Sequence, residues 1–232
     1  SVYEKTSGLE SKEELYRAVE DLCMHKLGEK LYNRLKQELQ IYIHASIDKL
    51  SDLNNNSNNS NDNTIFLSIV DNVWHDHCEH INTLRNIFLY LDRSYALETV
   101  GISSIWEIGL QLFRQRLENK YIIEQKIIEG IFTTIELDRI GQKIDVDIIK
   151  RILRMYLSIG QYHNKFEIPF LKDTERFFIK EGQSILNLSS NSIGSGTGTV
   201  TGDLSNPWDF MIHIEKRLSQ AVDMCNRYLD IS

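Results

Sequence analysis

Apolar residues recur every three or four positions along most of the chain, which is the spacing of amphipathic helices. Ser11, with Glu14 three residues later, predicts a helix start closed by a capping box. Gly28 is predicted to end this helix, because glycine is the usual residue after a helix C-terminus. A second helix is predicted from about Glu29 to Leu50.

A third and longer helix is predicted to start at Thr64 and to run for roughly thirty residues, or about 45 Å. Its apolar positions continue at helical steps as far as Leu91. Further helices are predicted near 103–119, 121–139, 146–160, 163–187 and 207–230. We find no convincing alternation at period two over a strand's length, and the chain has only two prolines. The predicted class is all-α, an elongated stack of antiparallel helical bundles.

Two segments break this periodicity. Asn54 to Asn63 is almost entirely Asn and Ser, and Ser189 to Asn206 is rich in Ser, Gly, Thr and Asn. Such compositions cannot bury enough apolar surface to offset the entropy lost on ordering. We therefore expect both segments to be loops inserted between helices of the same domain.

The composition restricts the classes of function. The net charge is −7 at pH 7, which disfavours a nucleic-acid binder because phosphate binding needs clustered Lys and Arg. No run of about 18 apolar residues is present, so we expect no membrane segment. The three cysteines, Cys23, Cys78 and Cys225, are odd in number and far apart. They predict a reducing compartment, with each thiol buried as a small apolar group.

The densest group of candidate metal ligands lies between Trp74 and His80. On a helix, His77 and His80 share a face, whereas His75 points elsewhere and Cys78 lies on the apolar stripe. The spacing does not match a zinc motif. We interpret His77 as a structural residue, hydrogen-bonded at a helix interface, and predict no metal. A metal-dependent helical enzyme built on His77, Cys78 and His80 is the alternative hypothesis.

No other pattern indicates catalysis. No Ser or Cys stands beside a base on a strained turn, as nucleophilic catalysis requires. The glycine-rich run around 194–202 has no Lys–Ser/Thr end and follows no strand, so it is not a phosphate loop. We predict a non-catalytic protein without a cofactor and without catalytic residues.

The predicted helix 103–119 has a wider apolar arc than one buried face explains. Its apolar positions span about 200°, whereas a helix packed on one side needs little more than 100°. Trp106 and Leu110 lie at the edge of this arc, bordered by Glu107 and Arg114. Trp and Arg in such a setting are typical of binding hot spots.

The first predicted helix has a similar edge. Tyr16 flanks its apolar stripe, and charged residues stand beside it at Glu13, Arg17 and Glu20. From periodicity alone, packing of Tyr16 and Trp106 against neighbouring helices is an equally good explanation.

These same residues belong to motifs that resemble the amino-terminal region of the cullin family. Glu14 to Cys23, followed by Lys30-Leu31-Tyr32, resembles its opening, and Trp74 with His77 and then Arg85 to Tyr95 resembles its signature on the long helix. Ser104 to Arg114 looks like the cullin-4 form of the fifth helix. Phe166 to Gly182 continues the match into a second repeat. The resemblance covers nearly the whole chain apart from the two low-complexity segments.

Cullins are elongated scaffolds of multisubunit RING ubiquitin ligases, so the resemblance implies stacked five-helix cullin repeats. Residues 1–120 would form the first repeat without its first helix, and residues 121–232 would form most of the second. The family pattern also implies that the first helix, the extension before it and the carboxyl-terminal domain lie outside this chain. In cullins that last domain holds the RING-box protein and is neddylated. The implied compartments are the cytoplasm and the nucleus.

The resemblance also implies a docking site for a substrate adaptor on the second and fifth helices of the first repeat, which correspond to 11–27 and 103–119. The implied adaptor contacts are Glu13, Tyr16, Arg17, Glu20, Trp106, Glu107 and Leu110. A cullin-4 type would bind the β-propeller damaged-DNA-binding protein, which recruits WD40 substrate receptors. A cullin-3 type would bind BTB-domain adaptors, and His25 to Tyr32 has a cullin-3 character. A helical-repeat tether with another partner is a third possibility.

Overall fold

The structure is a computed structural model that describes residues 12–54, 61–191 and 207–228. Every regular element in these ranges is helical, which confirms the all-α class. No helix in them is both long enough and apolar enough to cross a bilayer. The chain divides into two compact units, Ser1–Ile144 and Asp145–Ser232.

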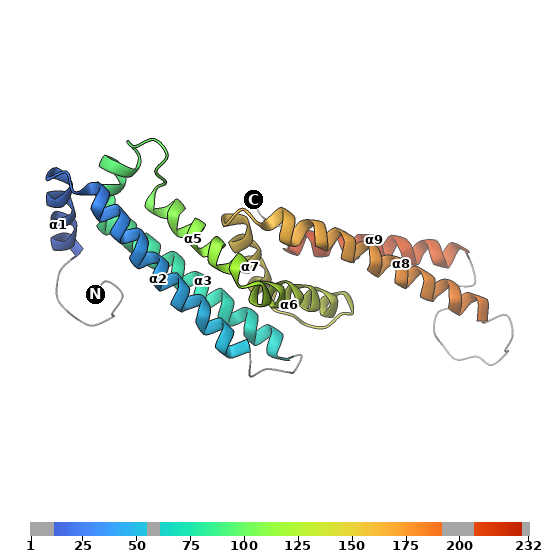
Figure 1. The fold of residues 1–232 in the computed structure, drawn as a ribbon. Coiled ribbons are helices and arrows are strands. Elements are labelled where there is room, and N and C mark those ends of the chain that lie inside the picture. Colours follow the sequence, from blue (N-terminus) through green and yellow to red (C-terminus); the bar gives the residue numbers. More distant parts are fainter. Residues whose placement is uncertain (1–11, 55–60, 192–206, 229–232) are drawn as a thin grey trace. The chain divides into compact units, whose positions relative to one another are not determined.

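The first unit contains α1 to α6 and one π-helical turn, η1. The bounds are α1 (Lys12–Met24), α2 (Gly28–Asn54), α3 (Asn61–Ile87), α4 (Leu89–Leu91), η1 (Asp92–Ala96), α5 (Ile105–Asn119) and α6 (Tyr121–Arg139). Figure 1 shows α2 and α3 side by side and antiparallel, with α5 along them. The prediction for 121–139 matches α6, whereas helix 103–119 begins two residues later than predicted.

The core of the first unit is aliphatic. The buried stripe of α2 includes Leu39, Ile43 and Ile47, and α3 faces it with residues such as Ile81 and Leu84, all between 0% and 1% exposed. Burying a side chain of this size contributes roughly 1.5–3 kcal/mol. The helices α2, α3, α5 and α6 pack against one another through these stripes, and α1 packs against α3 and α4.

The turn between α1 and α2 differs from the prediction. The helix α1 ends at Met24, and Lys26 adopts a left-handed conformation with φ of 60°. The amides of Lys26 and Leu27 donate to the carbonyls of Cys23 and Leu22, each at 3.0 Å. This is a Schellman ending in which a lysine takes the position that glycine usually occupies. Gly28 does not end α1 but begins α2. The predicted cap Ser11 lies outside the described residues.

The long predicted helix from Thr64 to Leu91 is interrupted. The helix α3 starts earlier, at Asn61, and ends at Ile87. Phe88 has φ −96° and ψ 22°, outside the helical region, and α4 and η1 follow it. In η1 the amide of Leu97 donates to the carbonyl of Asp92 at 2.9 Å, five residues back, as in a π-helix. Helix also extends into both low-complexity segments, because Asn54, 61–63 and 189–191 are helical. The rest of the two predicted loops lies outside the described residues.

The second unit contains α7 (Val146–Ser158), the π-helical turn η2 (His163–Glu167), α8 (Ile168–Asn191) and α9 (Pro207–Tyr228). Its most buried side chains come from α7, η2 and the end of α9, with Tyr156, Phe166 and Tyr228 all at most 1% exposed. Pro169 stands in the first turn of α8, which continues from η2 without a break.

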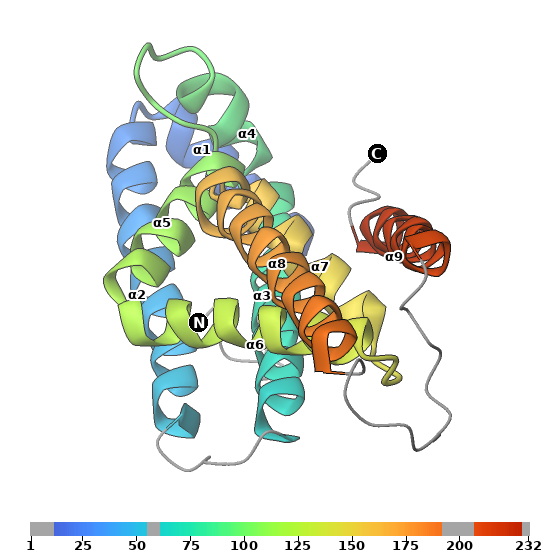
Figure 2. The same ribbon diagram turned by 90° about the vertical axis from the view of Figure 1, so that its right-hand side faces the viewer.

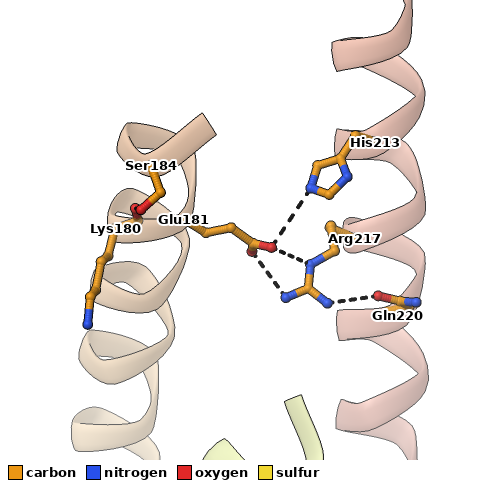
Figure 3. Close-up of polar contacts among 6 residues, drawn as sticks. All are labelled: Lys180, Glu181, Ser184, His213, Arg217 and Gln220. Carbon is orange, nitrogen blue, oxygen red and sulfur yellow. Dashed lines mark hydrogen bonds and ion pairs between the residues drawn. The ribbon is translucent and has the colours of Figure 1, made fainter. Parts of the chain in front are cut away.

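A carboxylate joins α8 to α9 within the second unit (Figure 3). Glu181 of α8 faces two residues of α9, with its Oε1 2.8 Å from Arg217 Nε and 3.8 Å from His213 Nε2. Arg217 also donates to Gln220 at 2.9 Å on its own helix. Three apolar side chains of α9 remain exposed: Met211, Leu218 and Val222 are 62%, 56% and 59% exposed.

The compact units and the expected repeats divide the chain at different places. The first unit extends to Ile144, so it includes α6, which the repeat boundary at 120/121 assigns to the second repeat. Compactness measures contacts, whereas a repeat boundary marks the start of a recurring pattern. The division into cullin repeats at 1–120 and 121–232 therefore stays a prediction.

Candidate adaptor-docking site

The residues predicted on the first helix occupy one side of α1. Glu13, Tyr16, Arg17 and Glu20 follow the helical spacing of three and four residues. Glu13 and Arg17 have side chains 73% and 70% exposed and form an ion pair at 2.7 Å. Tyr16 and Glu20 are half-buried. This side of α1 therefore presents a tyrosine ring among charged groups.

The residues predicted on α5 stand in its first two turns. Trp106 and Leu110, four residues apart, are half-buried, while Ile105, Ile108 and Leu112 point into the core. The edge position that the wide apolar arc predicts for Trp106 and Leu110 is thus what the structure has. Both side chains keep part of their surface available to a partner.

Glu107 has a structural role that the sequence analysis did not assign to it. Ser104 is the N-cap of α5, and its amide donates to Glu107 Oε2 at 2.9 Å. The Glu107 amide donates in return to Ser104 Oγ at 3.3 Å. This capping box stabilises the first turn of α5. The pattern Ser-x-x-Glu at 104–107 was visible in the sequence.

Two buried polar groups hold the start of α5 from other elements. The Ile105 amide donates to Asp92 Oδ1 of η1 at 2.9 Å, and Asp92 is only 4% exposed. The Tyr32 hydroxyl of α2 donates to the Ser103 carbonyl at 2.6 Å. Burial raises the pKa of Tyr32, so its hydroxyl stays a donor at neutral pH. Both residues lie within the motifs that carry the resemblance, but neither was assigned a role from the sequence.

The two predicted surfaces attach to the same segment, 89–96. The helix α1 packs on α4, and Asp92 of η1 holds α5. Cys23 and Lys26, at and just after the end of α1, line a hollow of about 300 Å³ together with Tyr90 and Ser94. Figures 1 and 2 both place α1 and the start of α5 at the end of the first unit where α4 lies.

We call the seven predicted contact residues the docking face: Glu13, Tyr16, Arg17, Glu20, Trp106, Glu107 and Leu110. Three glutamates and one arginine give it a formal charge of −2, since −3 + 1 = −2. Neither Tyr16 nor Trp106 is enclosed by its own chain. These seven residues combine partly exposed aromatic rings with mainly acidic charges, a composition that favours a partner with an apolar pocket and basic groups.

Exposed apolar side chains outside the seven predicted contact residues lie close to the docking face in sequence. Met24, at the end of α1, is 61% exposed. Leu97 and Val100, in the connection before α5, are 68% and 102% exposed. Their signal in the sequence is weak, because single apolar residues in connections are common on protein surfaces.

The histidines of the 74–80 run diverge. His75 pairs with Glu79 on the surface at 3.3 Å, and His80 Nδ1 lies 2.9 Å from the Tyr42 hydroxyl. His77 is 2% exposed between α3 and α5, with its ring 4.7 Å from that of Phe113. No group of three or more His, Cys, Asp or Glu side chains in the described ranges is arranged to hold a metal ion.

His77 is buried as a neutral ring. Burial lowers its pKa to about 4, outweighing the Gly109 carbonyl, which favours the protonated form. The sequence predicted a hydrogen bond from His77 at a helix interface. Within the described residues, His77 Nε2 has no hydrogen-bond partner of standard geometry. The prediction of buried cysteines is wrong in degree, because all three are only half-buried. Burial raises the pKa of Cys78 to about 11, which keeps the thiol protonated and poorly nucleophilic.

Comparison with known proteins shows which proteins this chain resembles in sequence. The family model for the cullin α-solenoid domain matches residues 1–232. Human Cullin-4A is 32% identical over 232 residues, covering 100% of this chain and 28% of that protein. Cullin-4 of Dictyostelium discoideum is 33% identical over 96% of the chain and 25% of its own length. Cullin-3A of Arabidopsis thaliana is 26% identical over 97% of the chain and 27% of its own length. The chain thus spans about a quarter of each.

Proposed function

Because this chain belongs to the cullin family, we propose that it is the adaptor-docking region of a cullin-RING ubiquitin-ligase scaffold. Its role is non-catalytic, and it acts by holding a substrate adaptor at one end of the scaffold. The RING-box protein would bind a carboxyl-terminal domain that is separate from residues 1–232. Ubiquitin-dependent degradation in the cytoplasm and nucleus is the cellular process that this role implies.

The observation that carries the proposal is the partial exposure of Trp106 on a first turn that hydrogen bonds hold in place. A tryptophan that the core only half covers, next to charged groups and an aliphatic neighbour at Leu110, has the composition of an interface hot spot. The capping box and the ties to Asp92 and Tyr32 fix its backbone before any partner arrives. A preordered contact loses little conformational entropy on binding.

For the adaptor we propose the β-propeller damaged-DNA-binding protein. The support is the cullin-4 relatives, at 32% and 33% identity over nearly the whole chain. A BTB-domain adaptor is the second candidate, since a cullin-3 relative matches at 26% over 97% of the chain.

Binding of the purified chain to each adaptor, measured by calorimetry, tests the proposal. Changing Trp106 to Ala should weaken binding to the propeller adaptor by about 30-fold or more, the equivalent of roughly 2 kcal/mol for a hot spot. Trp208, 71% exposed on α9 in the second unit, provides the matched control. Trp208→Ala removes an equally large ring outside the docking face and should leave the affinity unchanged.

Circular dichroism must show that both variants remain folded. If Trp106→Ala binds as tightly as the parent, the docking face is misassigned. If the parent binds a BTB adaptor more tightly than the propeller adaptor, the chain is of the cullin-3 type. Binding to neither would refute the adaptor-docking role itself.

A further inference from the structure

We propose that Asp92 is a positioning residue of the docking face. Its buried carboxylate, assisted by the Tyr32 hydroxyl, fixes the first turn of α5 and so sets the placement of Trp106 relative to α1. This inference rests on the proposed function, because it concerns how the two halves of the same adaptor surface are kept in register.

The contact between Asp92 and α5 joins a charged acceptor to a helix N-terminus. Asp92 Oδ1 accepts the Ile105 amide at 2.9 Å, and the carboxylate is 4% exposed. A charged acceptor makes a stronger hydrogen bond than a neutral one, and the positive end of the helix dipole adds to it. A buried carboxylate without such a partner would be costly. The pairing therefore holds α5 at a defined distance from η1.

Tyr32 holds the chain at a second point, Ser103, which lies two residues before Ile105. Its hydroxyl donates to the Ser103 carbonyl at 2.6 Å, and its ring lies edge-on to Tyr95 of η1 with centroids 5.6 Å apart. Tyr32 is 7% exposed. Residues 103 and 105 are thus held from α2 and from η1, and Trp106 follows them directly.

The segment that holds α5 also carries α1. The helix α4 packs against α1, and η1 begins at the next residue with Asp92. The π-helical turn inserts an extra residue per turn, which changes the direction in which the following side chains point. Segment 89–96 therefore supports one half of the docking face by packing and the other half through the Asp92 carboxylate.

The consequences of losing the Asp92 tie should be local to the start of α5. Ile108, Leu112 and Phe113 remain buried and keep the middle of the helix in place. The first turn, which contains Trp106, would retain its own capping box but lose its attachment to η1. Trp106 would then sample several positions, and an adaptor would have to select one of them.

Three variants separate positioning from simple stability. Asp92→Ala removes the acceptor, Asp92→Asn keeps an amide oxygen at the same position, and Tyr32→Phe removes only the hydroxyl. Amide hydrogen exchange of 105–108 is measured on the free chain. Affinity for the propeller adaptor is measured by calorimetry, at a temperature where circular dichroism shows each variant folded. If Asp92→Ala does not fold, Tyr32→Phe carries the test alone.

Asp92→Ala should speed exchange at 105–108 and weaken adaptor binding about tenfold, as expected when a preordered contact becomes mobile. Asp92→Asn should stay within about threefold of the parent because the acceptor is kept. Tyr32→Phe should show both effects to a smaller extent. In the Trp106→Ala background, Asp92→Ala should have little further effect, because coupled residues are not additive.

Two results would overturn the inference while leaving the proposed function intact. One is a parent-like affinity for folded Asp92→Ala, when Trp106→Ala does weaken binding. The other is an affinity loss that is the same with and without Trp106, which would indicate general destabilisation. If Trp106→Ala itself has no effect, the docking face is misassigned and the inference fails with it, whereas the adaptor-docking role fails only if the parent binds neither adaptor. The exchange rates at 105–108 still report on the Asp92 tie in that case.

Discussion

Gly109 of α5 and Ile81 of α3 approach so closely that a Cβ on residue 109 would stand 2.3 Å from Ile81 Cδ1. Ile81 is fully buried, so its side chain has little room to move away. The two helices can pack at this distance because residue 109 has no side chain. This close contact determines how deeply the middle of α5 sits in the first unit.

Changing Gly109 to Ala should destabilise the protein. Alanine improves helix propensity by about 1 kcal/mol over glycine, but overpacking a core typically costs about 1–3 kcal/mol. Because the contact is with a fully buried neighbour, we expect the loss to exceed the gain by about 1 kcal/mol or more. Urea unfolding followed by circular dichroism measures the difference.

Gly182 of α8 is the matched control for this substitution. It also lies within a helix, but a Cβ there would meet nothing within 4 Å. Gly182→Ala should therefore stabilise the protein by roughly 0.5–1 kcal/mol through propensity alone. A Gly109→Ala variant as stable as Gly182→Ala would show that α3 and α5 do not pack this closely.

His77 should make the protein less stable as the pH falls. Burial lowers its pKa to about 4, whereas in the unfolded chain it returns to near 6.5. Below pH 6.5 the unfolded state therefore binds more protons than the folded state. Stability should fall between pH 6.5 and 4 by up to roughly 3 kcal/mol from this residue, and its contribution should level off below pH 4.

Two histidine variants test this pH dependence through urea unfolding at a series of pH values. His77→Phe keeps a ring beside Phe113 and cannot titrate, so its stability should vary less than the parent's between pH 6.5 and 4. His75→Gln changes a histidine that is 71% exposed on the same helix and should leave the profile unchanged. A parent-like pH profile for His77→Phe would assign the acid sensitivity to other groups.

Helical periodicity predicted the existence of the helices well but not every boundary. The positions 121–139 of α6 followed from the apolar spacing alone. The end of α1 did not, because Lys26 adopts a left-handed conformation that sequence rules assign to glycine. The break at Phe88 and the π-helical turn after it also leave no strong signal. Both depend on how segment 89–96 packs against α1 and α5.

The docking face was predictable only where exposure follows from helix geometry. Trp106 and Leu110 stand at the edge of an apolar arc, and the structure leaves both half-buried there. The residues that hold this surface were not predictable. Asp92 and Ile105 are thirteen residues apart and meet at 2.9 Å through a turn that periodicity does not reveal. Tyr32 and Ser103 meet although they are 71 positions apart in the sequence.

Asp48 should matter more to stability than an equally charged surface residue. Arg116 Nη2 lies 2.6 Å from its Oδ2, and Lys120 Nζ lies 2.9 Å from its Oδ1. Hydrogen bonds from Lys120 and Arg116 hold the pKa of Asp48 below its usual value. Arg116 is only 18% exposed, so Asp48→Asn leaves a largely buried cation without its counter-charge. We expect a loss of about 1 kcal/mol in urea unfolding, limited by solvent screening of the aspartate.

Glu13→Gln is the comparison for Asp48→Asn. The Glu13–Arg17 pair is at least 70% exposed on both sides, and exposed pairs on a helix contribute about 0.5 kcal/mol or less. Equal losses for the two variants would mean that the Asp48 cluster acts as an ordinary surface ion pair.

Glu181→Gln should loosen α8 from α9 within the second unit (Figure 3). The pair with Arg217 is short, at 2.8 Å, and both side chains are mostly covered, at 24% and 23% exposed. Glutamine keeps an oxygen acceptor but removes the charge that balances Arg217, so we expect a loss of roughly 1–2 kcal/mol. Faster amide hydrogen exchange across α8 and α9 would report this loss of stability. Glu175→Gln, an exposed change on the same helix, should alter exchange little. If the two variants exchange alike, apolar packing rather than Glu181 joins these helices.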